Sequence, residues 1–157
     1  MKSILIIIGV LLLTACQNSS AVMTLEEASP DQLISATKAG LTLELLQDTF
    51  QESPLILETT LMNNSSKDFE FGDYYYLEVE KEGAWFILVH SDAVFIENPK
   101  LTDFGKVLSA GSQVQQDFSI DMLGLKLPPG QYRVVKTFLS NSLPFQEISL
   151  AVPFKVE

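Results

Sequence analysis

The chain has little cysteine, histidine, tryptophan or positive charge. Its 157 residues include one cysteine, one histidine and one tryptophan, so no disulfide can form within the chain. No apolar run reaches the roughly 20 residues that a membrane-spanning helix needs. Ten Lys and Arg against 20 Asp and Glu give a net charge of −10, which disfavours nucleic acid as a partner because charges of the same sign repel. Without disulfides, a folded domain must rely on its apolar core, for which ten Phe and four Tyr supply material.

The N-terminus has the layout of a secretory signal. One positive charge, Lys2, precedes the apolar run from Ile4 to Leu13, and small residues follow. Leu13-Thr14-Ala15-Cys16 resembles the lipobox of bacterial lipoproteins, in which a diacylglyceryl group is attached to the cysteine before cleavage. The resemblance implies a signal peptide over residues 1–15, lipidation of Cys16, and a place on the cell membrane facing the extracytoplasmic side. The alternative is a buried helix or an uncleaved anchor with an incidental cysteine.

Residues 16–39 are interpreted as the lipidated cysteine, a tether and a possible short helix. The stretch from Gln17 to about Ser29 is polar and has no sustained period, which is typical of a flexible tether. Ser29-Pro30-Asp31-Gln32 favours a helix start, with the helix running through Lys38 and stopped by Gly40.

Beyond Gly40 the apolar residues alternate with polar ones, which indicates strands. Polar or Gly-containing turns separate the segments. The predicted strands are 41–45, 55–62, 75–80, 84–89, 114–120, 131–139 and 148–156. This pattern predicts an all-β, immunoglobulin-like antiparallel β-sandwich of about seven strands over residues 40–157.

Three residues are assigned structural roles: Gly130, Tyr132 and Trp85. Pro129-Gly130 suits the centre of a type II turn. Tyr132 then follows at the start of a strand, where immunoglobulin-like sandwiches carry a tyrosine that bonds back to the preceding corner. Val134 occupies the place of the usual cysteine, as expected of a chain without a disulfide. The alternative is that Tyr132 is one more core aromatic residue.

Four short motifs follow one another in a fixed order along the chain. They are Asn63-Asn64-Ser65, Phe71-Gly72-Asp73-Tyr74-Tyr75, Glu78 through Gly83-Ala84-Trp85, and Leu127 to Lys136. In this order and spacing they resemble the bacterial immunoglobulin-like domain family found on lipoproteins and extracytoplasmic segments of Gram-positive bacteria. The resemblance covers about residues 40–157 and departs from the family in a long tip at 139–144. It implies a fold and a location but no shared catalytic residues.

No catalytic or metal-binding signature stands out. His90 is followed by Ser91 and Asp92, but neighbouring residues on a strand point to opposite faces, so these three residues form no ready triad. The sequence also lacks a Gly-x-Ser-x-Gly elbow, a His-Glu-x-x-His pair and a P-loop. We therefore expect no enzyme activity, no cofactor and no bound metal.

A group of carboxylates forms a predicted acidic patch. Glu78, Glu80 and Glu82 share one face of a strand by their spacing. Asp68, Glu70 and Asp73 lie close in sequence and resemble a calcium loop only loosely. The favoured interpretation is a solvated strand face that discourages aggregation at the edge of the sheet.

Two candidate interaction surfaces follow from the pattern. Tyr74, Tyr76, Phe86 and Leu88 alternate away from the predicted core and would form an exposed aromatic face. Alternatively, the segment from Phe95 to Phe104 covers this face. The second surface is the loop tip of Asn141, Ser142, Leu143 and Pro144.

These observations predict a membrane-anchored binding or interaction module. Its partners would be the membrane, through lipid on Cys16, and a protein at the cell envelope. The alternative function is inhibition of an extracellular protease or another envelope enzyme, by insertion of the loop from Asn141 to Phe145 into its active site.

Overall fold

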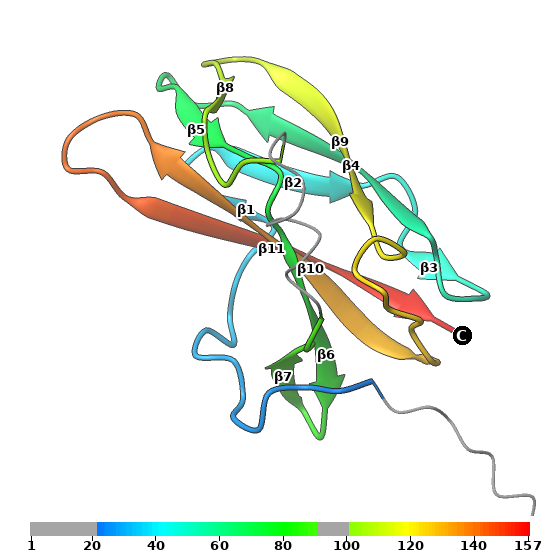
Figure 1. Ribbon diagram of the computed structural model, residues 1–157. Helices are drawn as coiled ribbons and strands as arrows, with labels where there is room; N and C mark the ends of the chain where they lie inside the picture. The colour runs from blue at the N-terminus through cyan, green and yellow to red at the C-terminus, as the bar shows by residue number, and fades with distance from the viewer. Residues whose placement is uncertain (1–21, 91–100) are drawn as a thin grey trace, which may run out of the picture.

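The computed structural model describes residues 22–90 and 101–157. The signal segment and Cys16 lie outside these residues, as do Ser91, Asp92 and most of the segment from Phe95 to Phe104. The described residues form eleven strands and no α-helix, arranged in one sheet of four strands and one of seven (Figure 1). The predicted all-β, immunoglobulin-like sandwich is confirmed.

The smaller sheet is antiparallel throughout. Its strand order is β1-β2-β4-β9. The strands are β1 (Thr37–Lys38), β2 (Leu41–Leu45), β4 (Ile56–Asn63) and β9 (Gln113–Ser119).

The larger sheet is built around the long strand β10 (Gly130–Ser140). One edge of β10 pairs along its length with β11 (Glu147–Val156), and the other edge pairs with two shorter strands, β5 (Phe69–Phe71) and β6 (Tyr76–Lys81). The remaining strands of this sheet extend it at both sides. They are β3 (Thr49–Phe50), parallel to β11, then β7 (Ala84–Ile87), beside β6, and β8 (Lys106–Leu108), beside β5.

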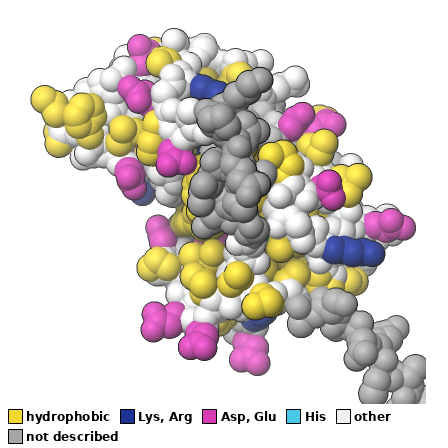
Figure 2. Space-filling view, in the orientation of Figure 1, with side chains coloured by type: hydrophobic (Ala, Val, Ile, Leu, Met, Phe, Trp, Pro, Cys, Tyr) yellow, Lys and Arg dark blue, Asp and Glu magenta, His cyan; other side chains and the backbone are white. Residues whose placement is uncertain are grey.

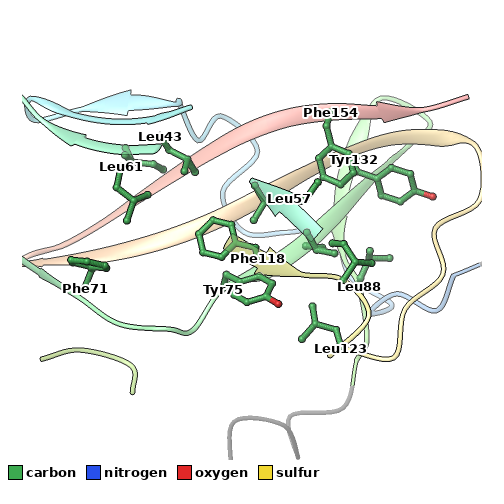
Figure 3. Packing of buried hydrophobic residues seen from close by; sticks show 14 of the residues in the cluster. Leu43, Leu57, Leu61, Phe71, Tyr75, Leu88, Phe118, Leu123, Tyr132 and Phe154 are labelled. Carbon is green, nitrogen blue, oxygen red and sulfur yellow. The ribbon is translucent and has the colours of Figure 1, made fainter. Parts of the chain in front are cut away.

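The core lies between the two sheets, where side chains from both point toward one another (Figure 3). Phe118 of β9 is fully buried and meets the Tyr75 ring at a centroid distance of 4.6 Å. Tyr132 of β10 stacks on Phe154 of β11 at 5.5 Å. This aromatic packing supplies the cohesion of a domain that has no disulfide.

Tyr132 also makes the hydrogen bond of a tyrosine corner. Its hydroxyl donates to the carbonyl oxygen of Pro128 at 2.6 Å, and burial raises its pKa to about 12. Val134, two residues on, is fully buried.

The predicted type II turn at Pro129-Gly130 is wrong. Such a turn needs a positive φ at Gly130, and the φ of Gly130 is not positive. Gly130 is instead the first residue of β10, paired with Val156. A Cβ there would lie 3.3 Å from the Tyr132 ring, so the glycine leaves room for the tyrosine to fold back.

The predicted helix between Ser29 and Lys38 is also wrong. The chain turns at 32–33 and enters β1 at Thr37. The Asp31 carboxylate accepts a hydrogen bond from the Leu33 amide at 3.1 Å, and the carbonyl oxygens of Asp31 and Gln32 accept from the Arg133 guanidinium of the larger sheet. Bonds to distant residues therefore outcompete the local helical pattern.

Candidate interaction surfaces

The segment 22–35, here called the N-terminal segment, packs on the domain along β7. Val22 contacts the core, and Thr24 forms a bridge with Leu88. The predicted flexible tether is thus wrong from residue 22 onward, because this part forms an added edge of the larger sheet. The backbone hydrogen bonds run from Val89 N to Met23 O at 2.9 Å, from Leu25 N to Ile87 O at 2.9 Å and from Ser29 N to Trp85 O at 2.8 Å.

A buried ion pair holds this segment in place. The Arg133 guanidinium on β10 donates to the Glu78 carboxylate on β6, and the two residues are 3% and 0% exposed. The same guanidinium donates to the carbonyl oxygens of Asp31, at 2.7 Å, and Gln32, at 3.1 Å. Ser29 donates its hydroxyl to the second Glu78 oxygen at 2.5 Å. A buried pair satisfied in this way is costly to break, since either partner alone would leave an uncompensated charge.

Gln32 and Trp85 complete the contact. The Gln32 side chain accepts from the Trp85 amide at 2.7 Å and donates to the Trp85 carbonyl at 3.0 Å, as a paired strand would. The Arg133 guanidinium lies 4.6 Å from the centre of the Trp85 ring, a cation–π distance. The structural role of Trp85 is therefore to anchor the N-terminal segment.

The prediction that Glu78 belongs to an exposed acidic patch is wrong. Its carboxylate lies beneath the N-terminal segment, while Glu80 and Glu82 are exposed as expected of a solvated face. Asp73 pairs with Lys106, and Asp68 accepts from the Ala110 amide at 2.8 Å. Within residues 22–90 and 101–157 no three His, Cys, Asp or Glu side chains gather as a metal site would require.

The predicted aromatic face is not a continuous exposed surface. Leu88 is 1% exposed, and its side chain belongs to the hydrophobic core between the sheets (Figure 3). Tyr76 and Phe86 are half-buried, and burial, with a smaller effect of Glu78, raises the pKa of Tyr76 to about 12. Tyr74 keeps 37% exposure. The alternative, in which the segment from Phe95 to Phe104 covers this face, concerns residues that mostly lie outside the described part of the chain.

A buried lysine spans the break between β5 and β6. Lys136 of β10 points between the sheets, is fully buried, and donates to the carbonyl oxygens of Gly72 and Tyr74, the latter at 2.7 Å. These carbonyls belong to the stretch that leaves the sheet, so the ammonium replaces the missing ladder bonds. Burial is the main cause that lowers the Lys136 pKa to about 7, with the charges of Asp73 and Lys106 as smaller, opposing effects.

The opposite end of the sandwich is organised by Asn63, which is fully buried. Its amide nitrogen donates to the carbonyl oxygens of Lys67, at 2.7 Å, and Leu108, at 2.9 Å. Its oxygen accepts from the amide and the hydroxyl of Ser65, at 3.0 and 2.7 Å. One side chain thereby fixes the β4–β5 loop against β8.

The β10–β11 loop lies at this same end and protrudes. Leu143 is 82% exposed and Phe145 is 61% exposed, and Asn141, Ser142 and Pro144 are exposed as well. Hydrophobic side chains gather at the tip in the space-filling view (Figure 2). The Ser140 backbone amide donates to the Gln146 carbonyl at 2.9 Å, which closes the loop on itself.

A hollow of about 310 Å³ opens beneath this loop. Four serines line it, together with the buried apolar residues Phe69 and Ile148. The lining residues are Ala39, Ser65, Ser66, Lys67, Phe69, Ser140, Ser142, Leu143, Pro144, Gln146 and Ile148.

Sequence reasoning found the loop tip but missed Glu78, Arg133, Lys136 and Asn63 as organising residues. The available signal was charge inside an apolar strand, because Arg133 and Lys136 flank the pair Val134-Val135. Charged residues are rarely buried unless they are paired, so their presence there indicated partners from elsewhere in the chain.

The sequence matches the bacterial Ig-like domain family over residues 37–155, so the chain belongs to this family. Comparison with curated proteins gave no match. Among solved structures, a β-glucosidase from Listeria innocua in complex with gluconolactone aligns at 18% identity and a TM-score of 0.27, over 74% of this chain and 16% of that one. A β-glucosidase from Erythrobacter marinus aligns at 15% identity and 0.29, over 71% and 15%. The chain thus spans under a fifth of either enzyme.

Across the described parts of the chain, no helix has the length and apolar character to cross a membrane.

Proposed function

We propose that this chain is a lipid-anchored, extracytoplasmic lipoprotein whose Ig-like domain is a non-catalytic binding module for a protein of the cell envelope. The observation that carries the proposal is that the start of the N-terminal segment, beside β7, and the β10–β11 loop lie at opposite ends of the domain (Figure 1). An anchor at one end leaves the other end free to meet a partner.

Because the N-terminal segment packs on the domain, the linker between Cys16 and the folded domain would be short. Residue 22 already belongs to the domain, so only residues 17–21 separate it from Cys16. Six residue steps span at most about 20 Å when fully extended. The end of the domain that carries β6 and β7 would therefore stay close to the membrane.

The strand β10 sets the distance between the two ends. Arg133 holds the N-terminal segment, and Ser140 begins the protruding loop seven residues later. At about 3.4 Å per residue this separation is roughly 24 Å. The loop would therefore point away from the lipid surface. Loops held by a rigid scaffold often carry the binding residues of a protein.

Replacing Cys16 tests the anchor. We expect Cys16→Ala to move the protein from the membrane fraction to the soluble fraction, because the acyl chains provide the stable attachment. Asn18→Ala, two residues after Cys16, serves as the matched control and should stay with the membrane. Full retention of Cys16→Ala on membranes would contradict the anchored form.

Site-specific crosslinking in intact cells tests the binding end. A photoreactive residue at Leu143 should capture an envelope protein in a discrete band. The control position is Met122, which is 47% exposed and lies outside the β10–β11 loop. Equal capture from both positions, or none from Leu143, would refute a partner at the loop.

Inhibition of an envelope protease is a second candidate, favoured by the 82% exposure of Leu143 beside Pro144. Purified domain at micromolar concentration would then slow a protease from a panel, and Leu143→Ser would relieve the effect. Cleavage of the loop without inhibition would make the chain a substrate instead.

A further inference from the structure

The N-terminal segment continues the larger sheet beyond β7 as an edge strand (Figure 1). Thr24 lies opposite Leu88 in an antiparallel bridge, and the Leu88 side chain points into the core. Neighbours along a strand point to opposite faces, so the residues on either side of this bridge point outward from the sandwich. These outward residues are Met23 and Leu25 on the segment, and Ile87 and Val89 in and after β7.

These four side chains form an apolar patch, here called the edge patch. Met23 is 73% exposed, Leu25 is 49% exposed and Val89 is 39% exposed. Ile87, which lies opposite Leu25, is half-buried. Side chains opposite each other in an antiparallel pair have Cβ atoms about 5 Å apart, so the four adjoin. Contiguous exposed apolar surface of this kind marks a site of contact with a protein or a membrane.

The length of chain between Cys16 and the edge patch favours the membrane. Met23 follows Cys16 by seven residues, which span at most about 24 Å when fully extended. With lipid on Cys16, the edge patch would meet the bilayer as a tethered surface, at a high effective concentration that a protein in solution lacks. The short linker therefore selects the lipid surface as the occupant of the edge patch.

Carboxylates that flank the edge patch limit how deeply it can enter the bilayer. A carboxylate is costly in hydrocarbon, so these groups would remain in water while the apolar side chains reach the headgroup level. The same charges, on chains that each carry a net charge of −10, oppose pairing of two copies through this patch. The flanking residues, all exposed, are Glu26, Glu27, Glu80 and Glu82.

We propose that the edge patch is a second, non-covalent membrane contact, in which Met23, Leu25 and Val89 rest in the headgroup region of the bilayer where Cys16 is anchored. This contact rests on the proposed anchoring of Cys16 and specifies how the domain is oriented on the membrane. Because the patch lies on an edge strand, contact through it leaves the β10–β11 loop, at the other end of β10, free for a partner.

Chemical acylation of Cys16 tests the edge patch whether or not the cell lipidates this residue. Cys16 is the only cysteine, so a maleimide that carries one myristoyl-length chain attaches there alone. The protein runs from Cys16 to Glu157 and contains every described residue. One such acyl chain gives only marginal, reversible membrane binding. A contribution of the edge patch therefore appears directly in the partition of the protein between water and phosphatidylcholine vesicles, measured by sedimentation of the vesicles.

Met23→Ser with Leu25→Ser should lower this partition about tenfold, because two apolar side chains lose their contact with lipid. The matched control is Leu55→Ser with Met122→Ser, which removes the same two residue types from positions 68% and 47% exposed beside the smaller sheet. The control should partition within about twofold of the unmodified protein, since isolated exposed apolar residues form no patch. Thermal unfolding checks the fold of each variant. If the first double variant unfolds, Met23→Ser alone should give a smaller loss, which Met23→Leu should not show.

Trp85 reports where the domain touches the bilayer, because it is the only tryptophan and lies on β7 two residues before Ile87. At equal amounts of bound protein, its fluorescence should be quenched more by lipids with a nitroxide on the headgroup than by lipids with a nitroxide deep in the acyl chain. Met23→Ser with Leu25→Ser should lose most of this quenching, and the control variant should keep it.

Equal partition of the unmodified protein and the variant with Met23→Ser and Leu25→Ser, or equal quenching of Trp85 in both, would overturn the proposal. Partition that rises with the density of protein on the vesicles would indicate contact between copies and would also overturn it. Fractionation of Cys16→Ala tests the anchor in cells by itself, and the acylated protein does not depend on that result. Failure of the edge patch and failure of the anchor are therefore distinguishable.

Discussion

At the end of the sandwich near the β6–β7 hairpin, the N-terminal segment is fastened by a buried ion pair and by backbone pairing with β7. At the other end, the β10–β11 loop closes on itself through Ser140 and Gln146 and leaves Leu143 and Phe145 in solvent. The segment that the sequence predicts to be a tether is thus part of the fold from residue 22 onward, whereas the loop tip is exposed as predicted. Burial depends on what lies opposite a residue in space, which local hydrophobicity does not report.

Breaking the ion pair should give the largest difference between the two ends. Arg133→Met leaves the buried Glu78 carboxylate without its partner and should lower the free energy of unfolding by about 3–5 kcal/mol. Limited proteolysis should then cut within the N-terminal segment first. Urea denaturation measures the loss.

Lys155→Ala is the matched control, because its pair with Glu157 is at the surface, where solvent screening leaves it little effect on stability. The double change Glu78→Leu with Arg133→Met should recover much of the loss by removing the orphaned charge. Equal destabilisation by Arg133→Met and Lys155→Ala would contradict the fastening role of the pair.

Substitution of Asn63, at the end that carries the loop, should lower the free energy of unfolding less than Arg133→Met does. Asn63→Ala leaves the carbonyl oxygens of Lys67 and Leu108 without their donor and should lower stability by about 2–3 kcal/mol. The exposed neighbour substitution Asn64→Ala should change stability by less than about 0.5 kcal/mol. Hydrogen exchange should show faster opening of β8 in Asn63→Ala while the amides of Leu25 and Ser29 remain protected, and loss of protection at both ends would show that the ends are not independent.

A pH titration probes Lys136, which lies between the two ends. Burial lowers its pKa in the folded state from 10.5 to about 7, so between pH 7 and pH 10 the unfolded chain binds more protons than the folded one. Stability should therefore rise with pH in this window, by about 1 kcal/mol per unit, and level off below pH 7 where both states are protonated.

Lys136→Met should abolish this rise, since it removes the titrating group. Lys126→Met is the control, because Lys126 is exposed and does not contribute to the shift of the Lys136 pKa. A rise that persists in Lys136→Met would assign the pH dependence to another group.

Substitutions at the protruding loop should have the smallest effect on stability. Leu143→Ser with Phe145→Ser removes two exposed side chains and should change the free energy of unfolding by less than about 0.5 kcal/mol. The same change should greatly reduce crosslinking of a partner to this end. A loss of stability above 1 kcal/mol would show that the loop supports the fold, against the contrast drawn between the two ends.

The alternation of apolar residues was enough to predict β2, β4, β6, β7, β9, β10 and β11, since a period of two follows from the pleat itself. The strands β1, β3, β5 and β8 contain only two or three residues, too few to show a period. The loop tip from Asn141 to Pro144 was also readable, because polar and Pro residues separate two clear strands there. The hollow beneath it was not, since Ala39, Ser66 and Ile148 meet only in the folded sandwich.

By itself the sequence determined the fold class, the absence of a disulfide and the family to which the chain belongs, because period, cysteine count and motif order are properties of the linear chain. Tertiary structure decided that Glu78 is buried and that the segment beginning at residue 22 pairs with β7. The physical reason is that a charged or polar group is stable in the interior only when partners from distant segments satisfy it. Glu78, Arg133 and Ser29 satisfy one another across a hundred residues of chain, a match that exists only once the sheets have formed.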